Sequence, residues 1–380
     1  MGDGKTEKRE GDVMDYYFST EQLSVGYQGK PVISEIEIGL NQGEILTLIG
    51  PNGAGKSTIL KSIAGQLELI AGTISLEQKD LIQMTGNERA QKMAVVLTER
   101  LKSEMMTCED VVATGRYPYT GKFGLLQDED WQKIREAMEL VHVTEIKEQD
   151  FKKISDGQRQ RVMLARAICQ EPEIIILDEP TSFLDVKYKL EFLSMLQNLK
   201  KQKQLTVIMS IHELELAERV SDRILCVNGT YVDRYGTPED IFTPGYMRTL
   251  FSIETGNFDE ENSSMELEPP KGTPEVFVIA GGGRGRNVYR RLQRAGVPFA
   301  TGILFENDLD IPVANALATE VVKTKAFEPV PVECVKKAKE ILRKCEKVIC
   351  CQKTFGTWEE ANASLAHYAQ QLGKELERKA

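Results

Sequence analysis

The chain has 380 residues, 41% of them hydrophobic and 28% charged, and a formal net charge of −10. At roughly 100–200 residues per domain this length predicts two to three domains, and the composition excludes a collagenous or largely disordered protein. No run approaches the roughly 18–20 continuous apolar residues that a membrane-spanning helix needs, so we expect a chain that does not cross a bilayer. Residues 1–15 lack an apolar secretory core, which predicts a flexible N-terminus and no export.

Cysteine usage and charge narrow the choice of compartment and partner. Seven cysteines are scattered without a C-x-x-C pair, which is typical of a reducing cytosol. The last part of the chain, 273–380, holds 17 Lys and Arg against 13 Asp and Glu, a net +4, which leaves −14 before it. Because the larger part is acidic, we expect no nucleic-acid partner.

Apolar strands alternate with helical patterns through the first 255 residues. Strands are expected at Tyr16–Tyr27, Ile33–Leu40, Ile45–Ile49, Gly72–Leu76, Ala94–Leu97, Ile174–Leu177 and Leu205–Ser210, and a closing hairpin at Ile224–Val227 and Tyr231–Arg234. A helix is expected from Lys56 to about Gln66, and a helical period runs from Asp128 to about Ala167. This order predicts a mostly parallel sheet covered by helices and interrupted by a helical insertion.

A polar, acidic and proline-containing stretch, Gly256–Gly272, predicts a linker. After it, strands at Glu275–Ala280, Phe299–Phe305, Val321–Val322 and Val348–Cys351 alternate with helices near 287–295, 312–318, 332–345 and from 357. The second part is therefore expected to be a smaller α/β unit over 273–380.

A glycine-rich run follows strand Ile45–Ile49 and opens a helix, which is where the G-x-x-x-x-G-K-[ST] pattern requires it. Its residues are Gly50, Pro51, Asn52, Gly53, Ala54, Gly55, Lys56, Ser57 and Thr58. Glycines let backbone N–H groups turn toward phosphate oxygens, Lys56 reaches the β- and γ-phosphates, and Ser57 is suited to bind Mg²⁺. The run predicts a nucleoside triphosphate site.

Two acids end the apolar strand Ile174–Leu177. Because side chains alternate along a strand, Asp178 and Glu179 point in different directions and have different roles. Asp178 is suited to the Mg²⁺ shell, and Glu179 to polarising the attacking water as a general base.

The run Ile154–Arg161 completes a resemblance to the nucleotide-binding subunit of ATP-binding cassette (ABC) transporters. That family usually has L-S-G-G-Q here, and Ser155, Gly157 and Gln158 match it, whereas Ile154 and Asp156 depart from it. The resemblance implies an α/β fold: a P-loop NTPase domain of the ABC-ATPase type with a helical insertion over 16–255, plus a second, smaller α/β (Rossmann-like) domain over 273–380. It also implies ATP and Mg²⁺ as cofactors and a head-to-tail homodimer, in which Ser155 contacts the γ-phosphate held by Lys56 of the other copy.

The resemblance implies further site residues. His212 falls at the switch histidine that contacts the γ-phosphate and orients Glu179, so Glu179, His212 and Lys56 are the expected catalytic residues. Tyr27 matches the aromatic that stacks on adenine, and Asp185 faces the opposite subunit. The family usually places a Gln after the strand at Ala94–Leu97, where this chain has Glu99 as the nearest counterpart. A carboxylate still suits a metal, so Ser57, Asp178 and Glu99 are the expected Mg²⁺ residues.

The segment Val111–Tyr119 is similar to one in ATPases of iron-siderophore, haem and cobalamin importers. The resemblance therefore implies a partner permease, indirectly a substrate-binding protein, and a place on the cytoplasmic face of the membrane. Two alternatives remain open: a non-transport cassette acting on ribosomes or DNA, and a regulatory binding module in which Asp156 and Glu99 silence hydrolysis.

A second glycine-rich loop, Gly281–Gly285, follows strand Glu275–Ala280. It does not complete G-x-G-x-x-G, so we do not expect it to bind NAD. Two arginines beside exposed N–H groups suggest a phosphate- or carboxylate-bearing effector instead, and a dimer-bracing role stays open.

Overall fold

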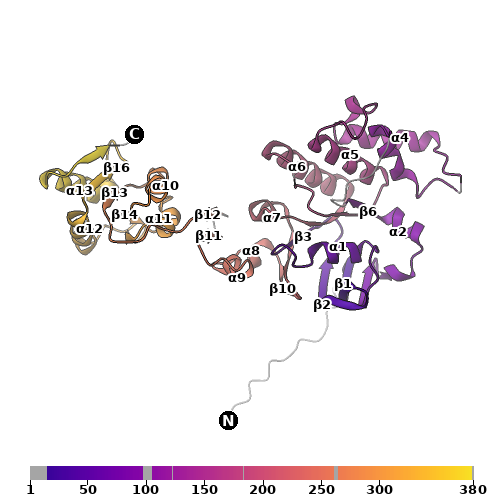
Figure 1. Ribbon diagram of the computed structural model, residues 1–380, viewed down its shortest axis with the longest axis horizontal. Coiled ribbons are helices and arrows are strands. Elements are labelled where there is room, and N and C mark those ends of the chain that lie inside the picture. Colours follow the sequence, from indigo (N-terminus) through magenta and orange to yellow (C-terminus); the bar gives the residue numbers. More distant parts are fainter. Residues whose placement is uncertain (1–14, 97–104, 122, 183, 261–263, 379–380) are drawn as a thin grey trace, which may run out of the picture. The chain divides into compact units, whose positions relative to one another are not determined.

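The computed structural model describes residues 15–96, 105–121, 123–182, 184–260 and 264–378. These residues form two compact units that divide between Thr243 and Pro244 (Figure 1). The division lies earlier than the predicted boundary at residue 255. The predicted linker 256–272 contains a small antiparallel pair, β11 (Asn257–Asp259) and β12 (Ser264–Glu266).

Described residues on both sides of the gap in this stretch have partners in the second unit. Phe258 is buried, and Glu260 accepts the N–H of Met247 at 3.2 Å in α9 (Tyr246–Leu250). Glu266 forms an ion pair with Arg290. The polar composition of the stretch does not reveal these contacts, because they are made with residues elsewhere in the sequence.

The first unit is built on one ten-stranded sheet, in the order β5-β4-β1-β2-β10-β9-β3-β8-β7-β6. The strands β9, β3, β8, β7 and β6 pair in parallel, whereas β5, β4, β1 and β2, and the pair β9 and β10, are antiparallel. Strands β2 and β10 also pair in parallel, so the sheet is mixed, and its continuous parallel part is the one that carries the phosphate loop. The bounds are β1 Phe18–Tyr27, β2 Lys30–Leu40, β3 Ile45–Ile49, β4 Ala71–Leu76, β5 Lys79–Asp80, β6 Met93–Val96, β7 Ile174–Leu177, β8 Thr206–Ser210, β9 Arg223–Asn228 and β10 Tyr231–Gly236.

Helices cover both faces of the parallel part. Alternate residues of β7 enter different cores: Ile175 and Leu177 pack with the helical insertion, and Ile174 and Ile176 pack with α1 and the antiparallel strands. Figure 1 shows α4, α5 and α6 lying together on one side of the sheet. The helices are α1 Lys56–Ile63, α2 Gly86–Lys92, α3 Cys108–Ala113, α4 Asp128–Leu140, α5 Asp156–Cys169, α6 Val186–Lys203, α7 Leu214–Val220 and α8 Pro238–Ile241.

The second unit is a five-stranded, wholly parallel sheet in the order β15-β14-β13-β16-β17. Helices α10 and α11 pack on one face, and α12 and α13 on the other. The expected smaller α/β unit is present. The bounds are β13 Val276–Ile279, α10 Arg286–Arg294, β14 Phe299–Phe305, α11 Ile311–Leu317, β15 Glu320–Thr324, α12 Val332–Lys344, β16 Lys347–Cys350, α13 Glu360–Gln371 and β17 Leu376–Arg378.

Among the residues described, no helix combines the length and the apolar character needed to span a membrane.

Candidate functional site: a phosphate loop with two acids

The glycine-rich run joins β3 to α1 in the way that the motif requires. Gly55 precedes the helix with φ 96°, in the left-handed region that favours glycine. A Cβ on Gly50, at φ 147°, would lie 2.1 Å from the carbonyl oxygen of Val227, so only glycine fits beside β9. The Lys56 ammonium donates to the carbonyl oxygens of Gly50 and Pro51 at 2.8 and 3.0 Å.

Lys56 is buried where the two acids that follow β7 approach the loop. Burial lowers the pKa of Lys56, and the carboxylates of Glu179 and Asp178 oppose that shift. The ammonium is therefore held in a partly dehydrated loop by carbonyl oxygens, which an incoming anion would replace with a stronger partner.

Ser57 and Asp178 meet across the sheet edge. Ser57 Oγ donates to Asp178 Oδ1 at 3.0 Å, and Ser210 Oγ donates to the same oxygen at 2.8 Å. A hydroxyl and a carboxylate are oxygen ligands that suit Mg²⁺. Within the described residues no group of three or more His, Cys, Asp and Glu side chains is arranged to hold a metal ion. Mg²⁺ would therefore need nucleotide oxygens and water as further ligands.

Glu179 and His212 form a close pair on neighbouring strand ends. Glu179 Oε1 lies 2.6 Å from His212 Nε2, and Glu179 Oε2 accepts from Ser182 Oγ at 3.2 Å. The Glu179 backbone adopts φ 49°, which is uncommon for a residue with a side chain and is held by a 2.9 Å hydrogen bond from its N–H to Ser210 Oγ. The structure thus brings together the two residues expected to activate water.

Sequence reasoning missed a third acid beside this pair. Glu213 accepts from Thr181 Oγ1 at 2.9 Å and forms an ion pair with Lys189 of α6. Burial alone would raise the pKa of Glu213, but Lys189 and Thr181 outweigh it, so that pKa lies below its ordinary value. In the sequence, only the position of Glu213 directly after His212 indicates that it lies near the site.

The remaining expected nucleotide contacts are placed as follows. Tyr27 ends β1 with its ring half exposed and its hydroxyl 3.3 Å from Thr58 Oγ1, beside the phosphate loop. Ser155 caps α5 and accepts the N–H of Gln158 at 3.3 Å. Asp185 caps α6 in the same way, accepting the N–H of Tyr188 at 3.1 Å.

Asp156 and Glu99 depart from the family pattern, and the structure describes only the first of them. The Asp156 carboxylate forms an ion pair with Arg159, and Gly157 packs against α6, where a Cβ would lie 3.2 Å from the Tyr188 ring. Glu99 lies outside the described residues, so its expected part in the metal site stays a prediction.

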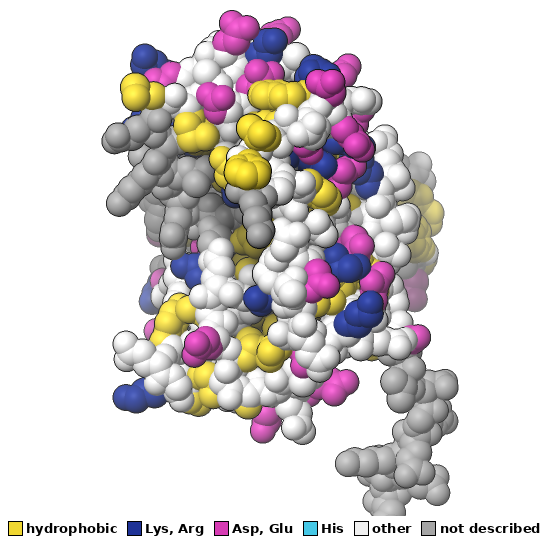
Figure 2. All heavy atoms as spheres, turned by 90° about the vertical axis from the view of Figure 1, so that its right-hand side faces the viewer, with side chains coloured by type: hydrophobic (Ala, Val, Ile, Leu, Met, Phe, Trp, Pro, Cys, Tyr) yellow, Lys and Arg dark blue, Asp and Glu magenta, His cyan; other side chains and the backbone are white. Residues whose placement is uncertain are grey.

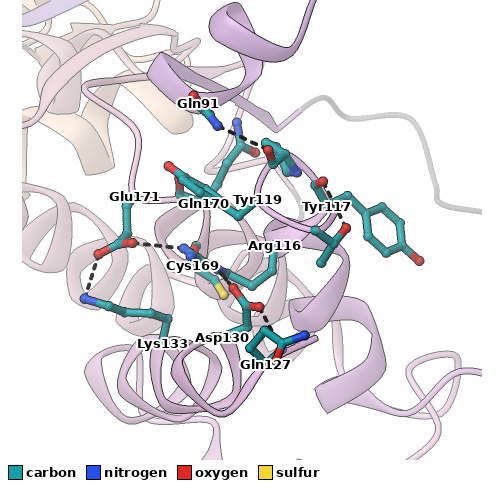
Figure 3. Close-up of polar contacts among 12 residues, drawn as sticks. Gln91, Arg116, Tyr117, Tyr119, Gln127, Asp130, Lys133, Cys169, Gln170 and Glu171 are labelled. Atoms are coloured by element: carbon teal, nitrogen blue, oxygen red, sulfur yellow. Dashed lines mark hydrogen bonds and ion pairs between the residues drawn. The ribbon is translucent and has the colours of Figure 1, made fainter. Parts of the chain in front are cut away.

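The segment expected to face a permease combines a buried anchor with exposed rings (Figure 3). Arg116 is 4% exposed and pairs with Asp130 of α4 and Glu171 at 2.9 Å each. Its guanidinium lies over the Tyr119 ring at 4.0 Å. Tyr117, by contrast, is 61% exposed. The arginine therefore joins the helices of the insertion, and the neighbouring tyrosine is available for contact.

Comparisons with known proteins agree with this geometry. The ABC transporter family model matches residues 33–182, and the MJ0874 family model matches residues 299–377. A solved structure described as a metal-chelate type ABC transporter in an inward-facing conformation aligns with a TM-score of 0.56 and 27% identity, over 66% of this chain and 95% of that one. The expected ABC-ATPase fold is confirmed.

Three relatives extend the likeness. The ABC transporter ATP-binding protein MJ0873 of Methanocaldococcus jannaschii is 43% identical over 72% of this chain and 94% of its own length. The iron(3+)-hydroxamate import ATP-binding protein FhuC of Bacillus subtilis is 37% identical over 62% and 88%, respectively. The cobalamin import ATP-binding protein BtuD of Halobacterium salinarum is 30% identical over 80% and 78%. With its phosphate loop, paired acids and signature helix, the chain belongs to the ATP-binding proteins of ABC transporters.

Proposed function

We propose that this chain hydrolyses ATP with Mg²⁺ and powers a membrane permease that imports a metal chelate. The proposal rests on two contacts made by adjacent acids. Ser57 Oγ donates to Asp178 Oδ1 at 3.0 Å, and Glu179 Oε1 lies 2.6 Å from His212 Nε2. One acid faces the phosphate loop and the other faces a histidine, which matches the two roles that phosphoryl transfer to water requires.

Each residue has a distinct task in this proposal. The Lys56 ammonium exchanges its two carbonyl partners for phosphate oxygens, and the Tyr27 ring stacks on the adenine of the nucleotide. Glu179 accepts a proton from the attacking water, and His212 holds the Glu179 carboxylate in place. Mg²⁺, held by Ser57 and Asp178, would neutralise charge on the phosphates.

A homodimer is part of the proposal. Ser155 and Gly157 stand at the N-terminus of α5, where N–H groups and the helix dipole favour an anion. Ser155 is exposed, and so is Asp185 at the start of α6. Both ends would meet the nucleotide and the phosphate loop of a second copy.

The permease contact is assigned to the helical insertion. A groove of about 450 Å³ lies between α2 and α5, lined among others by Arg89, Met163 and Arg166. Gln91 of α2 donates to the carbonyl oxygen of Pro118 at 3.2 Å, which links the helix that lines this groove to the segment that carries the exposed Tyr117. Figure 2 shows one group of apolar side chains in the upper part of the face that it views and another in the lower part. Docking at the groove would place the chain on the cytoplasmic face of a membrane, where a substrate-binding protein would act on the other side.

The choice of cargo rests on likeness. The relatives FhuC and BtuD are named for import of iron(3+)-hydroxamate and cobalamin, and the aligned structure is described as of metal-chelate type. We therefore assign an iron or cobalt chelate as the transported class.

The variant Glu179→Gln tests the proposal. It keeps the size of the side chain and removes its basicity, so it should retain ATP and Mg²⁺, form a dimer stable enough to see by sedimentation, and lose hydrolysis by about 10²–10⁴-fold. As a matched control, Glu218→Gln in α7 should hydrolyse ATP at the original rate. Unchanged hydrolysis in Glu179→Gln would overturn the assignment of the base.

A further inference from the structure

Two groups of carboxylates make close contacts with loops outside the phosphate site. In the second unit, Asp308 accepts the N–H of Gly282 at 2.8 and 3.0 Å. Asp310 accepts the N–H of Gly285 at 3.0 Å. The expectation of free N–H groups for an anion is therefore wrong at these positions. The other group surrounds Glu213 in the first unit, next to the pair expected to activate water.

His212 lies in a loop, between the end of β8 and the start of α7. Its side chain is 35% exposed, so close packing does not fix the ring on all sides. The 2.6 Å contact with Glu179 therefore depends on how the loop itself is held. The next residue along this loop is Glu213.

Glu213 begins α7 with its backbone but not with its side chain. Its carbonyl oxygen accepts the N–H groups of Leu216 and Ala217 at 3.0 Å each. A polar side chain at a helix start usually accepts an N–H of the first turn, but that of Glu213 does not. The carboxylate binds a different segment of the chain instead.

The Glu213 carboxylate binds both ends of the turn that leads from β7 to α6. Thr181 Oγ1 donates to Glu213 Oε2 at 2.9 Å, and the Lys189 ammonium forms an ion pair with Oε1. Burial would raise the pKa of Glu213, but Lys189 and Thr181 hold it below its ordinary value, so both oxygens remain acceptors. One carboxylate thus ties this turn to the loop that carries His212.

Glu213 and His212 hold the same segment at two positions. His212 contacts the Glu179 side chain, and Glu213 binds the buried Thr181, two residues further along. Ser182 Oγ also donates to Glu179 Oε2 at 3.2 Å within this segment. These contacts form a closed ring, so a shift of Glu213 would move the histidine relative to the carboxylate of the base.

We propose that Glu213 and Lys189 are positioning residues for ATP hydrolysis, which keep the His212 ring against the Glu179 carboxylate. The inference rests on the proposed function and adds to it two residues that act through His212. Loss of the carboxylate or of the ammonium loosens the loop, and a small displacement of reacting groups lowers the rate.

Steady-state ATP hydrolysis by the full chain tests the proposal. Glu213→Gln and Lys189→Met should each lower kcat about tenfold and change KM for ATP less than about twofold, because the nucleotide contacts stay intact. Lys189→Arg keeps the ion pair and should recover at least about half of the original kcat. Thermal unfolding shows whether each variant is folded, and Lys189→Met keeps the test valid if Glu213→Gln does not fold.

Two neighbouring ion pairs provide matched controls. Glu215 pairs with Arg219 within α7, and Lys187 pairs with Glu191 within α6, all at exposed positions. Glu215→Gln and Lys187→Met remove the same charges two residues away and should keep the original kcat. Equal losses in these controls would show a general sensitivity of the two helices to charge and would overturn the proposal.

The double variant Glu213→Gln with His212→Ala separates positioning from a structural role. If Glu213 acts through His212, the double variant should match the rate of His212→Ala alone within about twofold. A further tenfold loss, a raised KM with intact kcat in Glu213→Gln, or no recovery in Lys189→Arg would overturn the proposal. Hydrolysis that Glu213→Gln leaves unchanged refutes only this inference, whereas an unaltered chain that does not hydrolyse ATP refutes the proposed function on which it rests.

Discussion

Ser210 Oγ lies 2.8 Å from Asp178 Oδ1 and donates to it, where β8 and β7 end side by side. Ser210 Oγ also accepts a hydrogen bond from the N–H of Glu179 at 2.9 Å. One fully buried hydroxyl thus fixes the carboxylate expected to face Mg²⁺ and the backbone of the expected base.

We expect Ser210→Ala to lower the rate of ATP hydrolysis by roughly 10²-fold, because small displacements of reacting groups have effects of this size. Steady-state phosphate release measures it. Ser62→Ala is the matched control: Ser62 is also buried, and no partner for its Oγ is found among the described residues. Removing that hydroxyl should leave the rate unchanged. Equal losses in both variants would show a general packing effect and contradict a positioning role for Ser210.

His212→Ala tests the second contact of the base. Because His212 Nε2 touches Glu179 Oε1, its loss should reduce kcat by about 10²-fold or more and change KM for ATP much less. His367→Ala, an exposed histidine of α13, should match the unaltered chain. A raised KM with an intact kcat would instead assign His212 to nucleotide binding.

Arg159→Ala tests how the chain tolerates an acid in its signature helix. Asp156 pairs with Arg159 one turn along α5, so the arginine compensates the charge that would face a triphosphate. Without it, ATP-driven dimerisation should weaken about two- to fivefold, and less at high salt. Sedimentation in the Glu179→Gln background measures the effect. The double variant Asp156→Asn with Arg159→Ala should recover dimerisation, and failure to recover would contradict a charge effect.

Local patterns predicted the parts of this protein that depend on local chemistry. The bounds of β3, β7 and β14 were predicted to the residue, because buried parallel strands read as continuous apolar runs. The helix α6 was missed, although Phe192, Leu193, Leu196 and Leu199 form its buried stripe, because charged residues interrupt the pattern.

Contacts between distant segments could not be predicted in this way. Ser210 reaches Asp178 only because β8 pairs with β7, and Asp310 fills the second glycine loop only because β14 lies beside β13. Arg116 looked like part of a recognition segment, yet its partners Asp130 and Glu171 make it a buried anchor. Residue type and spacing give the chemistry available, while strand order decides which groups meet.

The ion pair between Arg116 and Asp130 should make the helical insertion sensitive to mutation and to acid. Asp130→Ala leaves Arg116 buried with one charge partner fewer, which should cost about 3 kcal/mol of unfolding free energy. Replacing both residues, as Arg116→Met with Asp130→Leu, should recover much of the loss because it removes the uncompensated charge. Thermal unfolding measures both variants, and a double variant no more stable than Asp130→Ala would contradict the pair as the cause.

The pH dependence of the same pair has a definite sign. Burial alone would raise the pKa of Asp130, but hydrogen bonds from the Gln127 N–H and the Arg116 guanidinium outweigh it and hold that pKa below its ordinary value. A carboxyl group with a lowered pKa stabilises the folded state above its unfolded pKa, about 3.9, and loses that contribution as the pH falls through the folded value. The difference in stability between the unaltered chain and Asp130→Ala should therefore be constant from pH 5 to pH 8 and shrink only below about pH 4. A difference that shrinks between pH 6 and pH 8 would contradict Asp130 as its source.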